Sequence, residues 1–212
     1  MIQTLDFPEL AFDPVQHVYV HRPTMRRLDS VTQVMGLLGL ALEWWSPAAL
    51  ARGRWVHECA HLFVLGDLDE EGARAQHPEW WGWVEAFIRA MSALHVEPRF
   101  SEVRLYDERW GLAGTADLPG IFYRGEREGW EIKTGDTSHV EIQCGGYDAM
   151  WKARVPGLPI ARWRCLELRR DGSFHLSDPL DVTGGWYDLA ACLRVLAARR
   201  RYARAHADKE AA

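Results

Sequence analysis

Three short stretches decide the fold of this chain: GTAD (residues 114–117), EIK (131–133) and QCGGY (143–147). In a strand, residues two apart share a face, so Glu131 and Lys133 are expected to point the same way. Antiparallel pairing with the preceding strand can bring Asp117 beside Glu131. Gln143 and Tyr147 are four residues apart and therefore share one face of a predicted helix. The spacing predicts two carboxylates and a lysine on neighbouring strands, followed by a polar pair on a helix.

These residue types together are typical of a divalent metal site. Two converging carboxylates suit Mg²⁺ or Mn²⁺, held with waters and a substrate phosphate. A lysine beside the cation can orient or deprotonate a water and neutralise charge on the attacked phosphorus. Taken alone, Glu131 and Lys133 are better explained as a salt-bridged strand surface. Gly114 indicates a bulge, a close backbone approach or a simple kink. The combination predicts a metal-dependent phosphodiester hydrolase.

Length and composition are those of a globular protein with one domain. The chain has 212 residues, 48% hydrophobic and 26% charged, enough for one well-buried core. No run approaches the ~18 apolar residues of a membrane helix, and residues 1–13 lack the features of a secretory signal. The four cysteines are far apart without a CxxC pair, which argues against a zinc knuckle or a disulfide framework. We therefore expect a reduced, cytoplasmic protein without a membrane partner.

The charge is unevenly distributed along the chain. The formal net charge is -5, whereas DNA-binding proteins usually carry a basic surface. Residues 67–71 are acidic, but residues 152–170 hold six basic side chains against Glu167 alone, and four arginines lie within residues 199–204. The charge therefore permits a nucleic acid as a partner without requiring one.

Periodicity and turn signals predict a mixed α/β architecture with a sheet between helices. The expected helices span residues 33–40 (capped by Ser30), 47–65, 79–94, 138–151 and 186–205, with an acidic loop at 66–77. The expected strands span residues 12–22 (a strand or hairpin), 100–106, 111–123, 129–134, 160–168 and 174–176. The three strands between residues 100 and 134 are expected to form an antiparallel meander. We expect one domain, with an extension (1–46), a catalytic core (47–178) and a C-terminal helix (184–206).

Four blocks of the chain resemble the RecB-like branch of the PD-(D/E)XK nuclease superfamily, which includes phage-type exonucleases. That branch is identified by G-x-x-x-H, G-x-x-D, (D/E)-x-K-T-G and Q-x-x-x-Y, in this order. The matching residues here are 53–57, 114–117, 131–135 and 143–147. The proline that gives the family its name is Ala116 in this chain. The upstream segment around His17, Tyr19 and residues 30–32 is also similar to the leader of small phage and prophage nucleases.

The resemblance implies a restriction-endonuclease-like αβββαβ core and a role for each matching residue. The implied metal ligands are His57, Asp117, Glu131 and the carbonyl of Ile132. Lys133 would be the catalytic lysine, and Gln143 and Tyr147 would complete the site. Glu102, on the strand before Asp117, would be an extra carboxylate for a second metal or the outer shell, or else an ordinary surface charge. The implied cofactor is Mg²⁺ or Mn²⁺; because no cysteine precedes His57, no iron–sulfur cluster is expected.

The resemblance also implies DNA as the substrate, either linear duplex or single strand, and a bacterial or phage-encoded protein. By analogy with the family, we expect that the protein could act with a recombination or helicase partner or as a homo-oligomer, and could serve in phage recombination. The resemblance favours an exonuclease, and the sequence leaves exonuclease versus endonuclease, DNA versus RNA, polarity and end preference open. A second hypothesis is a nuclease-like module that binds DNA ends without cutting.

A competing motif overlaps the first block. Residues 57–61 read HECAH and match H-E-x-x-H, in which two histidines on one helical face hold zinc and the glutamate is the base. Glu79 or Glu85, on the next predicted helix, would have to supply the third ligand. This zinc metalloprotease hypothesis leaves Asp117, Glu131 and Lys133 unexplained, so it ranks third.

Tryptophan is unusually abundant, with eleven residues in the chain. Exposed aromatic rings can stack on nucleic-acid bases, contributing ~1–3 kcal/mol per base. Trp80, Trp83 and Phe87 share one helical face, which favours packing against the core instead. The candidates for nucleic-acid contact are Trp44, Trp45, Arg52, Arg54 and Lys152.

Overall fold

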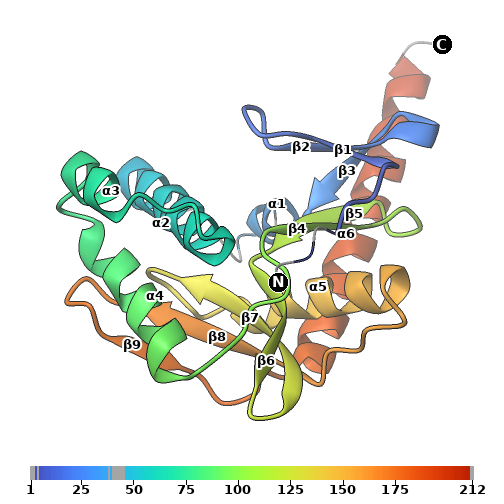
Figure 1. Ribbon diagram of the computed structural model, residues 1–212. Coiled ribbons are helices and arrows are strands. Elements are labelled where there is room, and N and C mark those ends of the chain that lie inside the picture. Colours follow the sequence, from blue (N-terminus) through green and yellow to red (C-terminus); the bar gives the residue numbers. More distant parts are fainter. Residues whose placement is uncertain (1–2, 4, 38, 40–45, 211–212) are drawn as a thin grey trace.

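The computed structural model describes residue 3, residues 5–37, residue 39 and residues 46–210 (Figure 1). Its helices are α1 (Val31–Gly36), α2 (Pro47–Leu65), α3 (Glu70–Gln76), α4 (Trp81–Ala93), α5 (Val140–Arg154) and α6 (Val182–Glu210), with a 3-10 turn at Arg22–Thr24. Its strands are β1 (Leu10–Asp13), β2 (Val18–His21), β3 (Arg26–Ser30), β4 (Val103–Asp107), β5 (Leu112–Ala116), β6 (Leu118–Tyr123), β7 (Glu126–Lys133), β8 (Arg162–Leu168) and β9 (Phe174–Leu176). Among these helices, none combines the length and the hydropathy needed to span a membrane.

The strands pair with mixed direction, in the orders β1-β2-β3-β5-β4 and β6-β7-β8-β9. The pairs β3–β5 and β7–β8 are parallel, and the other pairs are antiparallel. Only Asp117 separates β5 from β6, so the chain passes from one set of strands to the other at that residue. The predicted mixed α/β architecture, with helices flanking a mixed sheet, is confirmed (Figure 1).

The two larger of three apolar clusters among the described residues pack against the strands from different helices, and the third lies around Tyr19 and Tyr106. Of the two larger clusters, one fills the space between α2, α4 and the strands β6, β7 and β8, and includes Phe87 and Trp130. The other lies between α5, α6 and the strands β4 and β5, and includes Trp151 and Trp163. Trp80 and Trp83 are partly buried against the first core, which confirms that they serve packing. Burial of such large rings dominates the energetics of a small domain.

The N-terminal elements follow from local signals that the sequence contains. The expected hairpin forms between β1 and β2. Ser30 caps α1, because its hydroxyl accepts from the Gln33 N–H while the Gln33 side chain accepts from the Ser30 N–H. The next strand, β3, was not predicted. Its sequence RRLDS has no alternation of apolar residues, and the strand is held by pairing with β2 and β5.

Two predictions about the middle of the chain are wrong. The acidic loop at residues 66–77 contains a short helix, α3, whose N-cap Asp69 accepts from the Gly72 N–H. Glu70 and Glu71 at its start suit the positive end of the helix dipole. The single strand expected at residues 111–123 is two strands, β5 and β6, so the expected meander is interrupted at Asp117.

The helices α5 and α6 touch through glycines. A Cβ atom on Gly145 of α5 would overlap the backbone nitrogen of Trp186, and one on Gly185 of α6 would overlap the carbonyl of Glu141. Backbone cannot yield as a flexible side chain can, so these two positions require glycine. Gly145 belongs to the QCGGY stretch, and its part in that stretch is to bring the two helices together.

Substituting alanine for Gly145 is therefore expected to lower the free energy of unfolding by about 1–3 kcal/mol or more, the cost of overpacking a core. Urea unfolding followed by circular dichroism measures the change. Gly157→Ala is the matched control, because a Cβ there meets nothing within 4 Å, and it should shift the value by less than about 1 kcal/mol. Equal effects of the two substitutions would contradict the close helix contact.

Candidate metal centre where β5 meets β6

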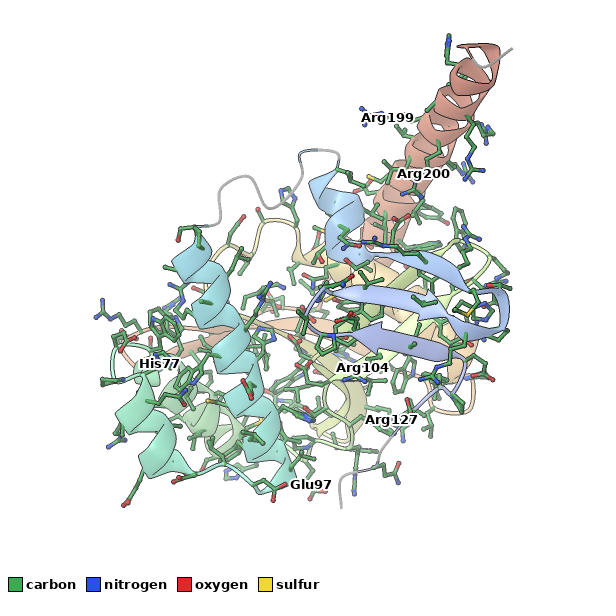
Figure 2. The ribbon with its side chains drawn as sticks, turned by 90° about the horizontal axis from the view of Figure 1, so that it is seen from above. His77, Glu97, Arg104, Arg127, Arg199 and Arg200 are labelled. Carbon is green, nitrogen blue, oxygen red and sulfur yellow. The ribbon has the colours of Figure 1, made fainter. Side chains whose placement is uncertain are left out.

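A cavity of about 1040 Å³ lies between α2 on one side and the strands β2, β4 and β5 on the other. Figure 2 shows these two walls from above, with Arg104 labelled. The residues that sequence analysis singled out and that line the cavity are His17, Tyr19, Arg52, Arg54, His57, Glu102, Asp117, Glu131, Ile132, Lys133, Gln143 and Tyr147. The four blocks, which span 95 residues from 53 to 147, thus meet around one space.

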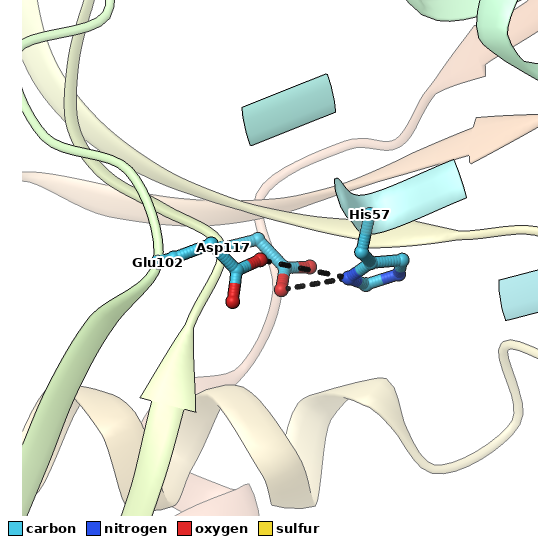
Figure 3. A group of neighbouring side chains, drawn as sticks. All are labelled: His57, Glu102 and Asp117. Atoms are coloured by element: carbon cyan, nitrogen blue, oxygen red, sulfur yellow. Dashed lines mark hydrogen bonds and ion pairs between the residues drawn. The ribbon is translucent and has the colours of Figure 1, made fainter. Parts of the chain in front are cut away.

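Three side chains from three parts of the chain converge in this cavity (Figure 3). His57 comes from the middle of α2, Glu102 from the segment before β4, and Asp117 from the junction of β5 and β6. The His57 Nδ1 lies 3.1 Å from Asp117 Oδ1 and 3.9 Å from Glu102 Oε1. One ligand atom from each residue lies within 4.8 Å of the other two, so the group could hold a metal ion.

Backbone pairing fixes the two carboxylates of this group. The antiparallel pairing of Leu118 with Trp130 sets Asp117 beside β7, where its Oδ2 accepts from the Ile132 N–H at 2.7 Å. The Glu102 N–H donates to the Asp117 carbonyl at 2.8 Å. Glu102 has a φ of 54°, a left-handed conformation that is costly for a residue with a side chain and that clusters at functional sites.

A chain of hydrogen bonds links β7 to α5 at the floor of the cavity. The Lys133 Nζ donates to Glu131 Oε1 at 2.9 Å and to Gln143 Oε1 at 2.6 Å. The Gln143 Nε2 donates to the Tyr147 hydroxyl at 2.9 Å. A Cβ on Gly114 would lie 2.6 Å from Cε1 of the Tyr147 ring. Of the alternatives left open for Gly114, the structure thus shows a close approach, and the approaching group is this ring. The chain holds the ammonium group in a fixed position.

Burial and mutual charge shift the pKa values of the half-buried His57 and the buried Asp117. Burial alone would lower the pKa of His57, but the charge and hydrogen bond of Asp117 outweigh it and raise the pKa to about 9. Burial likewise opposes ionisation of Asp117, but the His57 charge holds the pKa of Asp117 below its usual range. At neutral pH, His57 is therefore a cation and Asp117 an anion.

The other two carboxyl groups are harder to ionise. Burial, followed by the Asp117 charge, raises the pKa of Glu131 to about 7 and that of Glu102 to about 8. Burial would lower the pKa of Lys133, but the Glu131 and Asp117 charges, with the Glu131 hydrogen bond, together outweigh it and raise that pKa. The Glu131 Oε2 atom is buried without a hydrogen-bond partner among the described residues. Three carboxyl groups this close need a further positive charge before all of them can ionise.

The donor set fits a hard divalent cation. It combines carboxylate oxygens of Glu102 and Asp117 with one imidazole nitrogen of His57. Glu131, expected as a ligand, lies outside this group, although its Oε2 is buried and lacks a hydrogen-bond partner among the described residues. Carboxylates of this kind bind Mg²⁺ or Mn²⁺, ions that keep part of their coordination for water and substrate phosphate. Glu102, which sequence analysis gave only a secondary place, belongs to the central group.

The HECAH motif does not assemble a second metal group among the described residues. The His61 Nδ1 lies 2.9 Å from the Ser101 hydroxyl, with which it shares a hydrogen bond. The two glutamates expected as a third zinc ligand are engaged elsewhere: Glu79 pairs with His77 at 3.2 Å and Glu85 with Arg89 at 2.8 Å. His57 of the motif is grouped with the carboxylates instead.

Of the candidates for nucleic-acid contact, some line the cavity and others do not. Arg54 lines the cavity, as does Arg52, whose Nη2 donates to the Thr134 carbonyl at 3.1 Å and whose guanidinium lies 4.6 Å from the Trp83 ring centroid. Lys152 pairs with Asp148 at 2.6 Å and does not line the cavity. Trp44 and Trp45 lie outside the described residues.

Arg104 and Thr115 are among the residues of the cavity wall that were not predicted from the sequence. Arg104 lines it from β4, and Thr115 of β5 shares a 2.8 Å hydrogen bond with the Tyr19 hydroxyl. No local pattern marks Arg104, because Glu102 precedes β4 in a left-handed conformation and the alternation of an extended strand does not relate the two residues. Thr115 lies within the GTAD stretch itself, directly after the glycine.

Comparisons with known proteins give little guidance. No family model matches the chain, and no curated protein matches it. One similar solved structure is the crystal structure of a "putative exonuclease" from Eubacterium rectale, which is 12% identical to this chain. The match covers 77% of this chain and 72% of that chain, with a TM-score of 0.43.

Proposed function

We propose that this chain is a metal-dependent DNA nuclease of the RecB-like PD-(D/E)XK type, formed by a single domain. The observation that carries the proposal is the convergence of His57, Glu102 and Asp117 with the Glu131–Lys133 pair in one cavity. A module that only binds DNA has no need of this set. A salt-bridged strand surface, the simpler explanation of Glu131 and Lys133, would be exposed, whereas Glu131 is 1% exposed.

Each residue of the site has a proposed part in the reaction. His57, Asp117 and Glu131 would hold Mg²⁺ or Mn²⁺ with the Ile132 carbonyl, and Glu102 would be a further ligand or an outer partner. The ion supplies Lewis-acid chemistry, because it polarises a phosphate oxygen and lowers the pKa of water. Asp117 is held for this task by the Ile132 N–H, which fixes one of its oxygens.

Lys133 would position the attacking water and offset negative charge on the phosphate. Its pKa is raised, so the side chain is an ammonium group at neutral pH and can donate hydrogen bonds but cannot accept a proton. Gln143 holds this ammonium in place at 2.6 Å, and Tyr147 in turn binds Gln143. Preorganised positive charge of this kind stabilises the charge that develops as the phosphodiester bond breaks.

DNA with a free end is the proposed substrate, which makes the chain an exonuclease. Arg52, Arg54 and Arg104 line the cavity and can meet phosphates. The test incubates the protein with linear duplex, covalently closed circular duplex and single-stranded DNA, each with Mn²⁺, Mg²⁺ or EDTA. We expect metal-dependent loss of the linear forms only. Cutting of the closed circle would indicate an endonuclease, and binding without any cleavage would favour the end-binding module. One tightly held zinc per purified chain would favour the metalloprotease.

Metal affinity is expected to rise with pH. His57 has a pKa of about 9 and Glu131 one of about 7 in the metal-free protein, so both carry protons that a cation must displace. The affinity for Mn²⁺ should increase between about pH 6 and about pH 8.5, by up to ~10-fold per pH unit for each proton released. Calorimetry in buffers of different ionisation enthalpy measures both affinity and proton release. An affinity independent of pH would mean that neither residue is a ligand.

A further inference from the structure

The C-terminal helix extends beyond the rest of the chain. In its first half, Leu189, Leu193 and Leu196 of α6 are buried against the core. From residue 199 to residue 206 every residue is exposed. Figures 1 and 2 both show these last turns projecting away from the sheets, and Figure 2 labels Arg199 and Arg200 on them. The exposed stretch is a helix about 12 Å long, at ~1.5 Å per residue, that packs against none of the described core.

This part of α6 concentrates positive charge. Residues 194–206, which we name the arginine segment, contain five arginines and no acidic residue. The formal charge of -5 for the whole chain thus divides into +5 on this segment and -10 on the remainder. Arg200 binds Asp29 through two hydrogen bonds of 2.7 and 2.9 Å and fixes the helix to β3. Arg194, Arg199 and Arg201 are exposed and form no ion pair with the described side chains.

The other positive regions are compensated. Within residues 152–170, five of the six basic side chains form ion pairs: Lys152, Arg154, Arg162, Arg164 and Arg169. The cavity itself offers four arginine or lysine side chains against five carboxylates: Arg52, Arg54, Arg104 and Lys133 against Glu58, Glu102, Asp117, Glu131 and Asp136. The positive charge of residues 152–170 is therefore largely taken up by ion pairs, and that of the cavity is matched by its carboxylates. Long nucleic acids nevertheless draw most of their affinity from phosphate contacts.

We propose that the arginine segment binds the phosphate backbone of duplex DNA whose end occupies the cavity. This inference rests on the proposed nuclease function. At 100° per residue, Arg199 and Arg201 point to different sides of the helix, about 160° apart by that geometry. A single strand along one side could not reach both, whereas the major groove of a duplex admits a helix and surrounds it with phosphates. Duplex DNA therefore fits the distribution of charge better than a single strand.

The test removes three of these charges without disturbing the fold. Arg194→Gln/Arg199→Gln/Arg201→Gln keeps Arg200 on Asp29 and keeps helix propensity, since glutamine ranks close to arginine. Binding of a fluorescent linear duplex is measured in EDTA, so that no cleavage occurs, over a range of salt concentrations. The control is Arg89→Gln/Arg124→Gln/Arg170→Gln, which removes the same charge from exposed residues elsewhere.

We expect the arginine-segment variant to bind the duplex roughly 10- to 100-fold more weakly at low salt, and the slope of log affinity against log salt to fall by about 2–3. The control should leave the slope nearly unchanged. A single strand of the same length should lose less affinity. Equal losses in the two triple variants, or for the two DNA forms, would overturn the proposal. So would a change of molecular mass in light scattering with unchanged DNA affinity, which would identify a self-association surface.

A second measurement separates this inference from the proposed function. Hydrolysis of bis(p-nitrophenyl) phosphate with Mn²⁺ needs the metal centre but cannot reach the arginine segment. Equal hydrolysis by wild type and the arginine-segment variant, together with weaker duplex binding by the variant, is the expected result. Hydrolysis with unchanged duplex binding would refute only the arginine segment. Absence of hydrolysis with arginine-dependent duplex binding would refute the nuclease and leave the binding surface in place.

Discussion

Replacing Lys133 by alanine is expected to reduce DNA cleavage by about 10²- to 10⁴-fold, the range for loss of a group that acts directly on the reacting atoms. The ammonium group is buried in the site, 2.9 Å from Glu131 and 2.6 Å from Gln143. DNA binding should persist, because Lys133 contributes one charge of several in the cavity. Single-turnover cleavage of an end-labelled duplex, with binding measured in parallel, checks both expectations.

Lys152→Ala is the matched control for this substitution. Lys152 is an exposed lysine that pairs with Asp148 at 2.6 Å and lies outside the cavity lining, so its loss should change cleavage by less than about 2-fold. Thermal unfolding of both variants shows whether either has lost its fold. A Lys133→Ala protein that turns over like the wild type would remove the lysine from the mechanism, and loss of activity in both variants would place Lys152 on the path of the DNA.

The parts of the fold that short-range signals encode were predictable from the sequence. The bounds of α2 were predicted as residues 47–65 and are observed as Pro47–Leu65. Proline suits the first turn, Ser46 caps it through the Ala49 N–H, and Gly66 ends it in a left-handed conformation. The same holds for the contact of Gln143 with Tyr147, because a separation of four residues defines one helical face.

Elements that depend on distant partners were not predictable. The strand β3 has three charged residues among five and becomes a strand by pairing with its neighbour β2 and with β5 (Leu112–Ala116), which lies far along the chain. The break at Asp117 lies inside a stretch that reads as one strand, since nothing in LAGTADLPG marks where the chain changes from one set of strands to the other. Local propensity is a weak guide wherever tertiary pairing decides.

The candidate site shows the same division. Spacing along β7 predicted that Glu131 and Lys133 meet, and the 2.9 Å contact follows from that local rule. The place of Glu102 beside His57 depends instead on its left-handed φ and on its backbone bond to Asp117. No sequence pattern predicts a left-handed conformation at Glu102. A surface charge and a residue of the site were therefore equally good interpretations of this glutamate. Gly145 differs from Glu102, because it lies inside a motif of the site but serves the packing of α5 against α6.

Asp117→Asn should abolish most of the affinity for Mn²⁺ and with it metal-dependent cleavage. The substitution keeps the size of the side chain and an oxygen for the Ile132 N–H, which now bonds Asp117 Oδ2 at 2.7 Å. It removes the one carboxylate of the cluster whose pKa lies below its usual range, and thus the one fully ionised at neutral pH. Mutating a residue that only hydrogen-bonds a metal ligand typically lowers metal affinity ~10- to 100-fold. Loss of a charged ligand itself should lower the affinity by more than that.

Two measurements decide this prediction independently of catalysis. Calorimetry with Mn²⁺ reports the affinity directly, and Asp136→Asn is the control, since Asp136 also lines the cavity but lies outside the metal group. In the metal-free protein, NMR titration of His57 should show its pKa falling below the value of about 9, because the Asp117 charge and hydrogen bond are what raise it. A lowered His57 pKa with unchanged Mn²⁺ affinity would keep Asp117 as the partner of His57 and remove it from the metal site. An unchanged pKa would mean that the 3.1 Å contact between the two side chains does not exist in solution.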